Sequence, residues 1–257
     1  MVRSLYTAST GMVHQMNRLD VITNNMANSD TTAYKKEGST SQSFDSVYGI
    51  KINDSSVNYI HQPIGKMSLG VKVGETYTDY SDGNLEETEQ VYDMALNGNG
   101  FFAISYADKN GNESVRYTRD GNFTVNSDGV LVTKDGDFVL AEDGGLINIP
   151  EGVKISVDET GRITADGQEL GRFQLVDFED YDYLEKFGEN MYIAIDGATM
   201  KEAGCKVYQG YLEASNVNVV SEMVELITVT RDYESNQKVI QAIDETLEKS
   251  VGLGRLV

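Results

Sequence analysis

The residue types that most often carry out chemistry are scarce in this chain. Its 257 residues include one cysteine, Cys205, and two histidines, His14 and His61. A zinc site or a nucleophilic triad requires more ligands or partners than these three side chains offer. A cysteine without an activating neighbour is most often a small buried apolar residue. We therefore expect no catalytic residue and no metal ligand at these positions.

Two acidic stretches have side chains that could bind a divalent cation. Residues 108–119 begin like an EF-hand calcium loop, but Glu113 stands at the glycine position and Arg119 at the position of the last glutamate. This stretch instead predicts a hairpin turn. The acidic run at residues 177–182 could hold a cation, but a solvated loop is the simpler interpretation, because acidic residues occur throughout the chain.

Glycine-rich nucleotide-binding loops are incomplete in this sequence. The run LNGNGFF at residues 96–102 starts like a dinucleotide loop, but it lacks the third glycine and the following helix. Gly65-Lys66 has no glycine five residues before Gly65, as a phosphate-binding loop requires. The sequence therefore predicts no cofactor, no small-molecule substrate and no enzyme. A hydrolase that uses the acidic loop near Asp180 stays as an alternative, although no isolated pair of carboxylates supports it.

The charge of the chain excludes some classes of partner. The formal net charge is −20, and nearly all of it lies between residues 41 and 215. Such a surface disfavours nucleic acid and anionic membranes. The sequence has no stretch of 18 apolar residues and no secretory signal, so we expect a cytoplasmic protein or one exported without a cleaved signal.

The two ends of the chain carry a seven-residue apolar repeat. A period of seven predicts helices whose apolar stripe supercoils against a partner helix. The expected helices cover residues 2–28 and a segment that begins near residue 218 or 219. The repeat positions are Leu5, Met12, Leu19 and Met26 in the first helix, with Ile22 beside them, and Val219, Leu226, Tyr233, Ile240 and Leu247 in the second.

The predicted stripes are too thin to stabilise an isolated helix pair. The first is rich in methionine, and the second alternates with the polar residues Thr230, Gln237 and Asp244. Short amphipathic helices depend on tertiary packing for most of their stability. We therefore expect neighbouring copies of the chain to cover these stripes, which favours a subunit of a polymer.

The middle of the chain predicts a β-rich region. Asp-Gly and Asn-Gly pairs, which favour two-residue hairpin turns, recur from Asp82 to Gly167 with short apolar runs between them. Asn24, Asn25 and Asn28 are expected to end the first helix through side-chain hydrogen bonds. The predicted fold class is α+β. A coiled-coil-like helical domain comprises residues 1–32 and 216–257, an extended segment covers 33–70, and an inserted, mainly antiparallel β domain covers 71–215.

Three groups of motifs resemble the bacterial flagellar rod and hook proteins, most closely those of the distal-rod type. At the N-terminus they are SLYTASTGM (4–12), NNMAN (24–28) and TTAYK (31–35). In the centre they are LNGNGFF (96–102) and YTRDGNF (117–123). Near the C-terminus they are GYLEASNVN (210–218), EMVELI (222–227) and RDYESN (231–236). Ala33 departs from the pattern, because the family commonly has glycine there.

The resemblance implies a structural subunit of the flagellar basal-body rod. Such subunits leave the cell through the flagellar type III export apparatus and polymerise with copies of themselves and other rod or hook subunits. The product is a hollow tube that spans the cell envelope, conducts exported subunits and transmits torque. The terminal helices line its inner core, and the β domain forms the outer shell.

The residues expected at subunit interfaces are apolar positions of both helices. They are Leu5, Met12, Leu19, Ile22, Met26, Met223, Leu226, Ile227, Tyr233, Ile240 and Leu247. Two alternatives remain: a proximal-rod or hook-type axial subunit, and a secreted β-rich binding module whose helices only close the domain.

Overall fold

The computed structural model describes residues 2–50, 63–108, 113–150 and 153–254. His61 and the turn predicted at Asn110-Gly111 lie outside these ranges. The chain forms two compact units. The helix unit contains the two terminal helices and residues 37–79. The β unit contains Asn28–Lys36 and Tyr80–Val217.

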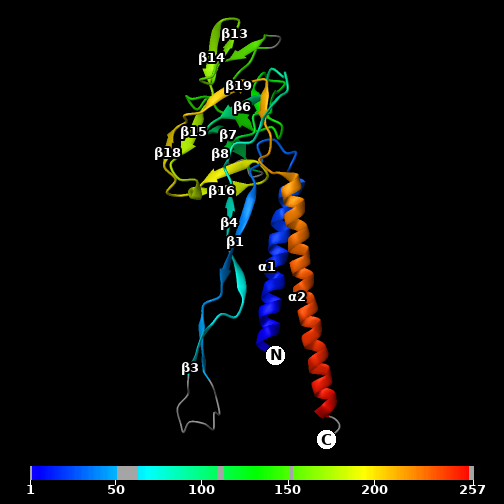
Figure 1. Ribbon diagram of the computed structural model, residues 1–257. Helices are drawn as coiled ribbons and strands as arrows, with labels where there is room; N and C mark the ends of the chain where they lie inside the picture. The colour runs from blue at the N-terminus through cyan, green and yellow to red at the C-terminus, as the bar shows by residue number, and fades with distance from the viewer. Residues whose placement is uncertain (1, 51–62, 109–112, 151–152, 255–257) are drawn as a thin grey trace. The chain divides into compact units, whose positions relative to one another are not determined.

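The helix unit is built on two antiparallel helices, α1 (Val2–Ala27) and α2 (Val219–Gly254), which lie side by side (Figure 1). The start of α2 contacts the end of α1, since Asn25 donates a hydrogen bond to Glu222 at 3.4 Å. Asn218 caps α2, because its Oδ1 accepts a hydrogen bond from the backbone N–H of Ser221 at 3.1 Å. The helices predicted at both ends of the chain are therefore confirmed, and they pack on each other within one chain.

A narrow β ribbon completes the helix unit. Strand β1 (Glu37–Ser43) pairs with β4 (Val71–Thr78), and β2 (Val47–Ile50) pairs with β3 (Pro63–Met67). Both β1 and β4 contact α1. Residues 37–50 and 63–79 are thus strands and turns that belong with the helices, where the sequence predicted an extended connection as far as residue 70.

The β unit has one large sheet of nine strands (Figure 1). Its continuous path runs β16 (Leu184–Phe187), β17 (Met191–Ala194), β8 (Glu113–Thr118), β7 (Phe101–Ala107), β11 (Phe138–Val139), β10 (Leu131–Thr133) and β9 (Phe123–Val125). Strand β15 (Leu175–Phe178) pairs with β7 and with β18 (Met200–Glu202). The 3₁₀ helix η1 (Tyr181–Tyr183) lies between β15 and β16 in the chain.

The described residues of the β unit also form three small sheets. They are β12 (Ile155–Val157) with β13 (Arg162–Ala165) and β14 (Gln168–Arg172), β6 (Met94–Asn97) with β19 (Lys206–Gln209), and β5 (Leu85–Glu87) with β20 (Tyr211–Glu213). Every strand pair in the described residues is antiparallel. The α+β class, with a mainly antiparallel region between two terminal helices, is therefore confirmed.

Strand β7 separates two apolar cores. Successive side chains of a strand point to opposite faces of the sheet. Phe102 and Ile104 accordingly belong to one buried cluster, while Phe101 and Ala103 belong to the other. A strand buried on both faces has a continuous apolar sequence, which is the pattern of residues 101–104.

The Asp-Gly pairs have two different roles. Asp166-Gly167 forms the predicted two-residue hairpin turn between β13 and β14, with φ of 48° and 80°. Asp82-Gly83 and Asp120-Gly121 do not join paired strands, so the hairpin prediction is wrong there. A Cβ atom on Gly83 would lie 1.9 Å from the carbonyl oxygen of Ala214, and these two glycines are needed for close backbone packing.

No helix in the described part of the chain is long and apolar enough to cross a membrane.

Candidate assembly site and buried charge cluster

The inner face of α2 follows the predicted seven-residue period. Leu226, Tyr233 and Ile240 are each half-buried. A second set of positions, four residues before or three residues after them, completes the 3–4 spacing of a helix seam. Together the positions of this inner seam are Glu222, Leu226, Val229, Tyr233, Asn236, Ile240 and Ile243.

The companion positions of the seam differ from the prediction. The sequence pattern placed Thr230, Gln237 and Asp244 in the seam. Thr230 is half-buried, but Gln237 and Asp244 are exposed. The seam instead includes Val229, which is buried, and Ile243, which is half-buried. Sequence spacing permits either i+3 or i+4 companions, and only packing against α1 selects between them. The seam prediction is therefore wrong at Gln237 and Asp244.

The inner face of α1 is assembled from small and apolar residues. Ile22 is 3% exposed, and Ala8 is also buried. Gly11 permits close approach of α2, because a Cβ atom there would lie 3.1 Å from Nδ2 of Asn236. The other predicted positions of this helix are half-buried: Leu5, Met12, Leu19 and Met26. The α1 stripe is thus partly covered within the chain by its own helix unit.

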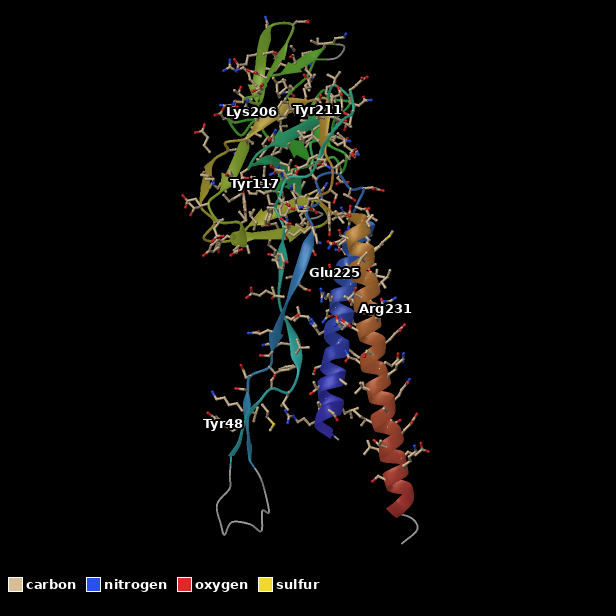
Figure 2. The ribbon with its side chains drawn as sticks, viewed as in Figure 1. Tyr48, Tyr117, Lys206, Tyr211, Glu225 and Arg231 are labelled. Carbon is tan, nitrogen blue, oxygen red and sulfur yellow. The ribbon has the colours of Figure 1, made fainter. Side chains whose placement is uncertain are left out.

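An apolar patch on α2 stays uncovered in the helix unit. Residues at i, i+3, i+4 and i+7 share one helix face. In the first turns of α2 these positions are Val220 (71% exposed), Met223, Val224 and Ile227 (50% exposed), which we call the α2 patch. Glu225 lies in the same turns of the helix (Figure 2), and its carboxylate forms an ion pair with Arg18 of α1. Leu247, farther along α2, is exposed as well.

The asparagines predicted at the end of α1 have different surroundings. Asn25 is buried, and its amide group donates to the carbonyl oxygen of Glu37 at 2.8 Å and accepts from the N–H of Glu37 at 3.0 Å. Asn28 accepts a hydrogen bond from the hydroxyl of Thr31 at 3.2 Å. Asn24 is exposed. Asn25 therefore links α1 to the first residue of β1, a contact that no sequence pattern indicates.

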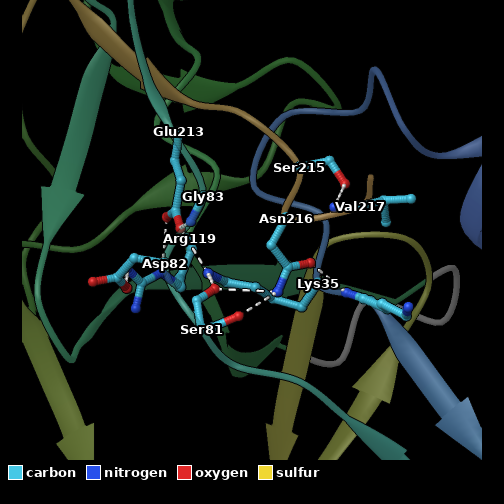
Figure 3. A network of polar contacts seen from close by, with 10 residues as sticks. Lys35, Ser81, Asp82, Gly83, Arg119, Glu213, Ser215, Asn216 and Val217 are labelled. Atoms are coloured by element: carbon cyan, nitrogen blue, oxygen red, sulfur yellow. Dashed lines mark hydrogen bonds and ion pairs between the residues drawn. The ribbon is translucent and has the colours of Figure 1, made fainter. Parts of the chain in front are cut away.

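The β unit contains a buried charge cluster that sequence reasoning missed (Figure 3). Both oxygens of the Glu213 carboxylate are engaged: Oε1 lies 2.6 Å from Nζ of Lys35, and Oε2 lies 2.9 Å from Nε of Arg119. The side chains of all three residues are no more than 2% exposed. Arg119 also pairs with the half-exposed Asp82 at 2.8 Å.

Backbone groups and one amide side chain extend the charge cluster. Lys35 donates to the carbonyl oxygen of Ser81 at 2.7 Å, and the N–H of Gly83 donates to Glu213 Oε1 at 2.9 Å. The Asn216 side chain accepts from the N–H of Lys36 at 2.7 Å and donates to Ser81 (Figure 3). Three separate segments, at residues 33–36, 81–83 and 213–216, are thus tied together around one carboxylate.

Burial and mutual repulsion act against the cations of this cluster. Burial lowers the pKa of Lys35, and the charge of Arg119 lowers it further, while Glu213 opposes both effects. Burial also disfavours the charge on Arg119, but Glu213 and Asp82 outweigh it and raise the pKa of Arg119. Glu213 therefore supplies the negative charge that allows Lys35 and Arg119 to be buried side by side as cations.

Each of the three motif regions supplies one member of the cluster. Lys35 ends the run TTAYK, Arg119 lies within YTRDGNF, and Glu213 lies within GYLEASNVN. Periodicity could not find these residues, because a charged residue on a loop has no apolar repeat. Their membership of the motifs was the signal in the sequence that pointed to them.

The acidic run at residues 177–182 makes hydrogen bonds and an ion pair within the β unit. Asp177 accepts hydrogen bonds from the Tyr181 hydroxyl and its neighbouring backbone N–H, and it pairs with Lys201 at 2.9 Å. Asp180 caps η1. Among the residues that the structure describes, no group of three or more His, Cys, Asp or Glu side chains is arranged to hold a metal ion.

Comparisons with known proteins cover most of the chain. Residues 5–35 match the flagella basal body rod protein family, residues 95–165 the D1 domain of flagellar hook protein FlgE/F/G, and residues 208–253 the C-terminal region of flagellar basal body rod FlgEFG proteins. The flagellar basal-body rod protein FlgG of Agrobacterium fabrum is 35% identical over 95% of this chain and 96% of its own length. FlgG of Bacillus subtilis is 33% identical over 99% of this chain and 100% of its own length.

The chain belongs to the flagellar basal-body rod protein family. This confirms the resemblance found in the motifs. The rod protein is a structural subunit of the flagellar basal-body rod, and its family is not enzymatic. The flagellar basal-body rod protein FlgF of Caulobacter vibrioides is also similar to it, at 34% identity over 97% of this chain and 96% of its own length.

Proposed function

We propose that this rod subunit is of the distal type and polymerises through α1 and α2 into a hollow axial tube that transmits torque from motor to hook. Its similarity to FlgG proteins over nearly the whole chain supports the distal type. A proximal-rod or hook-type subunit is the alternative, favoured by the similarity to FlgF. The tube would also conduct exported subunits, and the export apparatus and other rod or hook subunits would be partners of this chain.

The α2 patch is the observation that carries this proposal. Four apolar side chains on two helical turns are an unusual surface for a chain that remains alone in water. Contact with another helix would remove them from water, which stabilises the contact by about 25 cal/mol for each Å² of apolar area buried. We assign the α2 patch to the contact between neighbouring subunits.

The predicted interface residues divide into two groups under this proposal. Those that are half-buried or buried in the seam would set the geometry of the helix pair: Leu5, Met12, Leu19, Ile22, Met26, Leu226, Tyr233 and Ile240. Met223, Ile227 and Leu247 are exposed and would contact the neighbouring subunit directly. The β unit would then form the outer part of the tube.

The substitution Ile227→Asp tests the proposal. It places a charge in the α2 patch without changing the inner seam, so the purified protein should keep its helix content and unfolding midpoint. Assembly of rods in cells should stop, and motility should be lost. Gln241→Asp adds the same charge at an exposed polar position of α2 and should leave assembly intact. Normal rods built from the Ile227→Asp protein would refute the role of the patch.

Sedimentation separates the proposal from a binding module. A rod subunit should associate as its concentration rises, because its apolar patch favours contact with other copies. A binding module whose helices only close the domain would stay a compact monomer at every concentration. The second result, obtained with the full chain, would favour that alternative.

A further inference from the structure

The charge cluster joins the two segments of chain that lead to the terminal helices. Lys35 lies in residues 28–36, which follow α1, and Glu213 lies in residues 211–217, which precede α2. The two residues are 178 positions apart in sequence, yet their charged atoms are 2.6 Å apart. The backbone is joined as well, since the N–H of Ala33 donates to the carbonyl oxygen of Glu213 at 2.8 Å.

Charge balance makes Glu213 essential for this arrangement. Lys35 and Arg119 bring two buried cations, whereas Glu213 brings the one fully buried carboxylate that contacts both. Asp82 is 47% exposed and binds Arg119. Without the carboxylate of Glu213, the ammonium of Lys35 would lose its charge partner and remain beside a second buried cation, which is strongly unfavourable.

Within the cluster, Arg119 directly follows β8 of the main sheet, whereas Glu213 and the segments that bind it lie outside that sheet. Glu213 ends β20, which pairs with β5 in a two-stranded sheet of three residues per strand. The segments 33–36 and 81–83 that bind it belong to no strand of the large sheet. Elements with few ladder hydrogen bonds can open locally while the core of a protein stays folded.

We propose that Glu213 is a latch: it closes on Lys35 and Arg119 and holds together the segment that follows α1 and the segment that precedes α2, as a local unit that opens independently of the main sheet. The latch deepens the proposed function, because these two segments lead to the helices that would form the subunit contacts. It brings together the segment that begins where α1 ends and the segment that ends where α2 begins.

The latch also imposes an order on folding. Any process that delivers the chain from its N-terminus onward, ribosomal synthesis included, presents Lys35 and Arg119 long before Glu213. The last strand of the main sheet ends at Glu202, and Cys205 and Val207 complete one of its apolar clusters. All of these residues precede residues 211–216, so the sheet can form before residues 28–36 dock on Glu213.

Hydrogen exchange on the purified full-length protein tests the latch. In the Glu213→Gln protein, the amides of Ala33, Lys36 and Gly83 should exchange on the order of 100-fold faster, because each is hydrogen-bonded inside the cluster. The amides of Ala103 and Leu140, which bond within the main sheet region, should keep their wild-type rates. Equal acceleration of both groups, or no acceleration of the first, would overturn the proposal.

Two further variants keep the test decisive if Glu213→Gln fails to fold. Lys35→Met removes one cation and leaves Glu213 paired with Arg119, so the exchange rates at Ala33 and Lys36 should rise while those of the sheet do not. Glu159→Gln breaks the exposed ion pair with Lys206 and serves as the matched control, which should change neither group of amides. Protection at Ala33 and Lys36 that survives Lys35→Met would also contradict the latch. The measurement reports hydrogen bonds within one chain, so its outcome does not depend on whether the chain polymerises.

Discussion

The side-chain amide of Asn25 on α1 donates a hydrogen bond to the carboxylate of Glu222 on α2 at 3.4 Å, and both residues are only 1% exposed. The same amide bonds both backbone groups of Glu37. A polar contact thus fixes the two helices and the first residue of β1 at one end of the helix unit. Apolar packing alone would specify their alignment less strictly.

Substituting Asn25 should therefore weaken the helix unit. Asn25→Ala removes three hydrogen bonds from a buried site, and we expect a loss of about 2–4 kcal/mol in the free energy of unfolding. Urea unfolding followed by circular dichroism measures this loss. Asn17→Ala, on an exposed position of the same helix, is the control and should change the free energy by less than about 0.5 kcal/mol. Equal effects of the two substitutions would contradict the role of Asn25.

The backbone conformation at Ala33 predicts that replacing this residue with glycine stabilises the protein. Its φ of 56° lies in the left-handed region, where an L side chain costs roughly 1–2 kcal/mol and glycine costs nothing. Because glycine also loses about 0.5–1 kcal/mol of backbone entropy on folding, we expect Ala33→Gly to stabilise the β unit by about 0.5–1 kcal/mol. The unfolding midpoint should rise. Ala95→Gly, at a buried strand position with no positive φ, should lower it.

His14 should make the stability of the helix unit depend on pH. The ring is buried between α1 and β1, with Nε2 2.8 Å from the hydroxyl of Ser41 and with no hydrogen-bond partner at Nδ1. Burial lowers the pKa of His14 below its ordinary value of 6.5, and the charge of Arg18 lowers it further. The unfolded chain therefore binds this proton more readily than the folded chain.

The sign of the pH effect follows from that difference. The contribution of a neutral His14 is complete above pH 6.5 and is lost as the pH falls toward the lowered pKa of the folded state. The free energy of unfolding should be measured between about pH 7.5 and 5.5 for the wild-type and His14→Gln proteins. Its slope against pH should differ between the two proteins. The wild-type curve should fall more steeply with acid. Parallel curves would show that His14 does not titrate in this way.

Cys205 should react slowly in the folded protein. Its side chain is buried, and burial raises the pKa of the thiol, which lowers the fraction of reactive thiolate. We expect a disulfide reagent to modify Cys205 about 100-fold more slowly in native protein than in urea. A cysteine introduced at the exposed Ser127, in a protein that lacks Cys205, should show little difference between the two conditions.

Local sequence patterns determined the classes of element and the family of this protein. A period of seven at Leu226, Tyr233 and Ile240 fixed one side of a helix that needs a partner, because residues seven apart share a face of any α-helix. The Asp-Gly pair at Asp166 fixed a hairpin turn, because few residue pairs tolerate two consecutive positive φ angles. Short contiguous motifs were enough to indicate the family, because they can be recognised without knowing which distant residues are in contact.

Tertiary structure alone decided which distant residues meet. Ile243 and not Asp244 belongs to the inner seam, because the position of α1 selects among companions that helix geometry allows equally. Gly121 serves close packing against the carbonyl oxygen of Met94, which lies on a strand that a turn pattern cannot place. The pairing of Lys35 with Glu213 depends on burial and on the charge of Arg119, and both are properties of the folded chain.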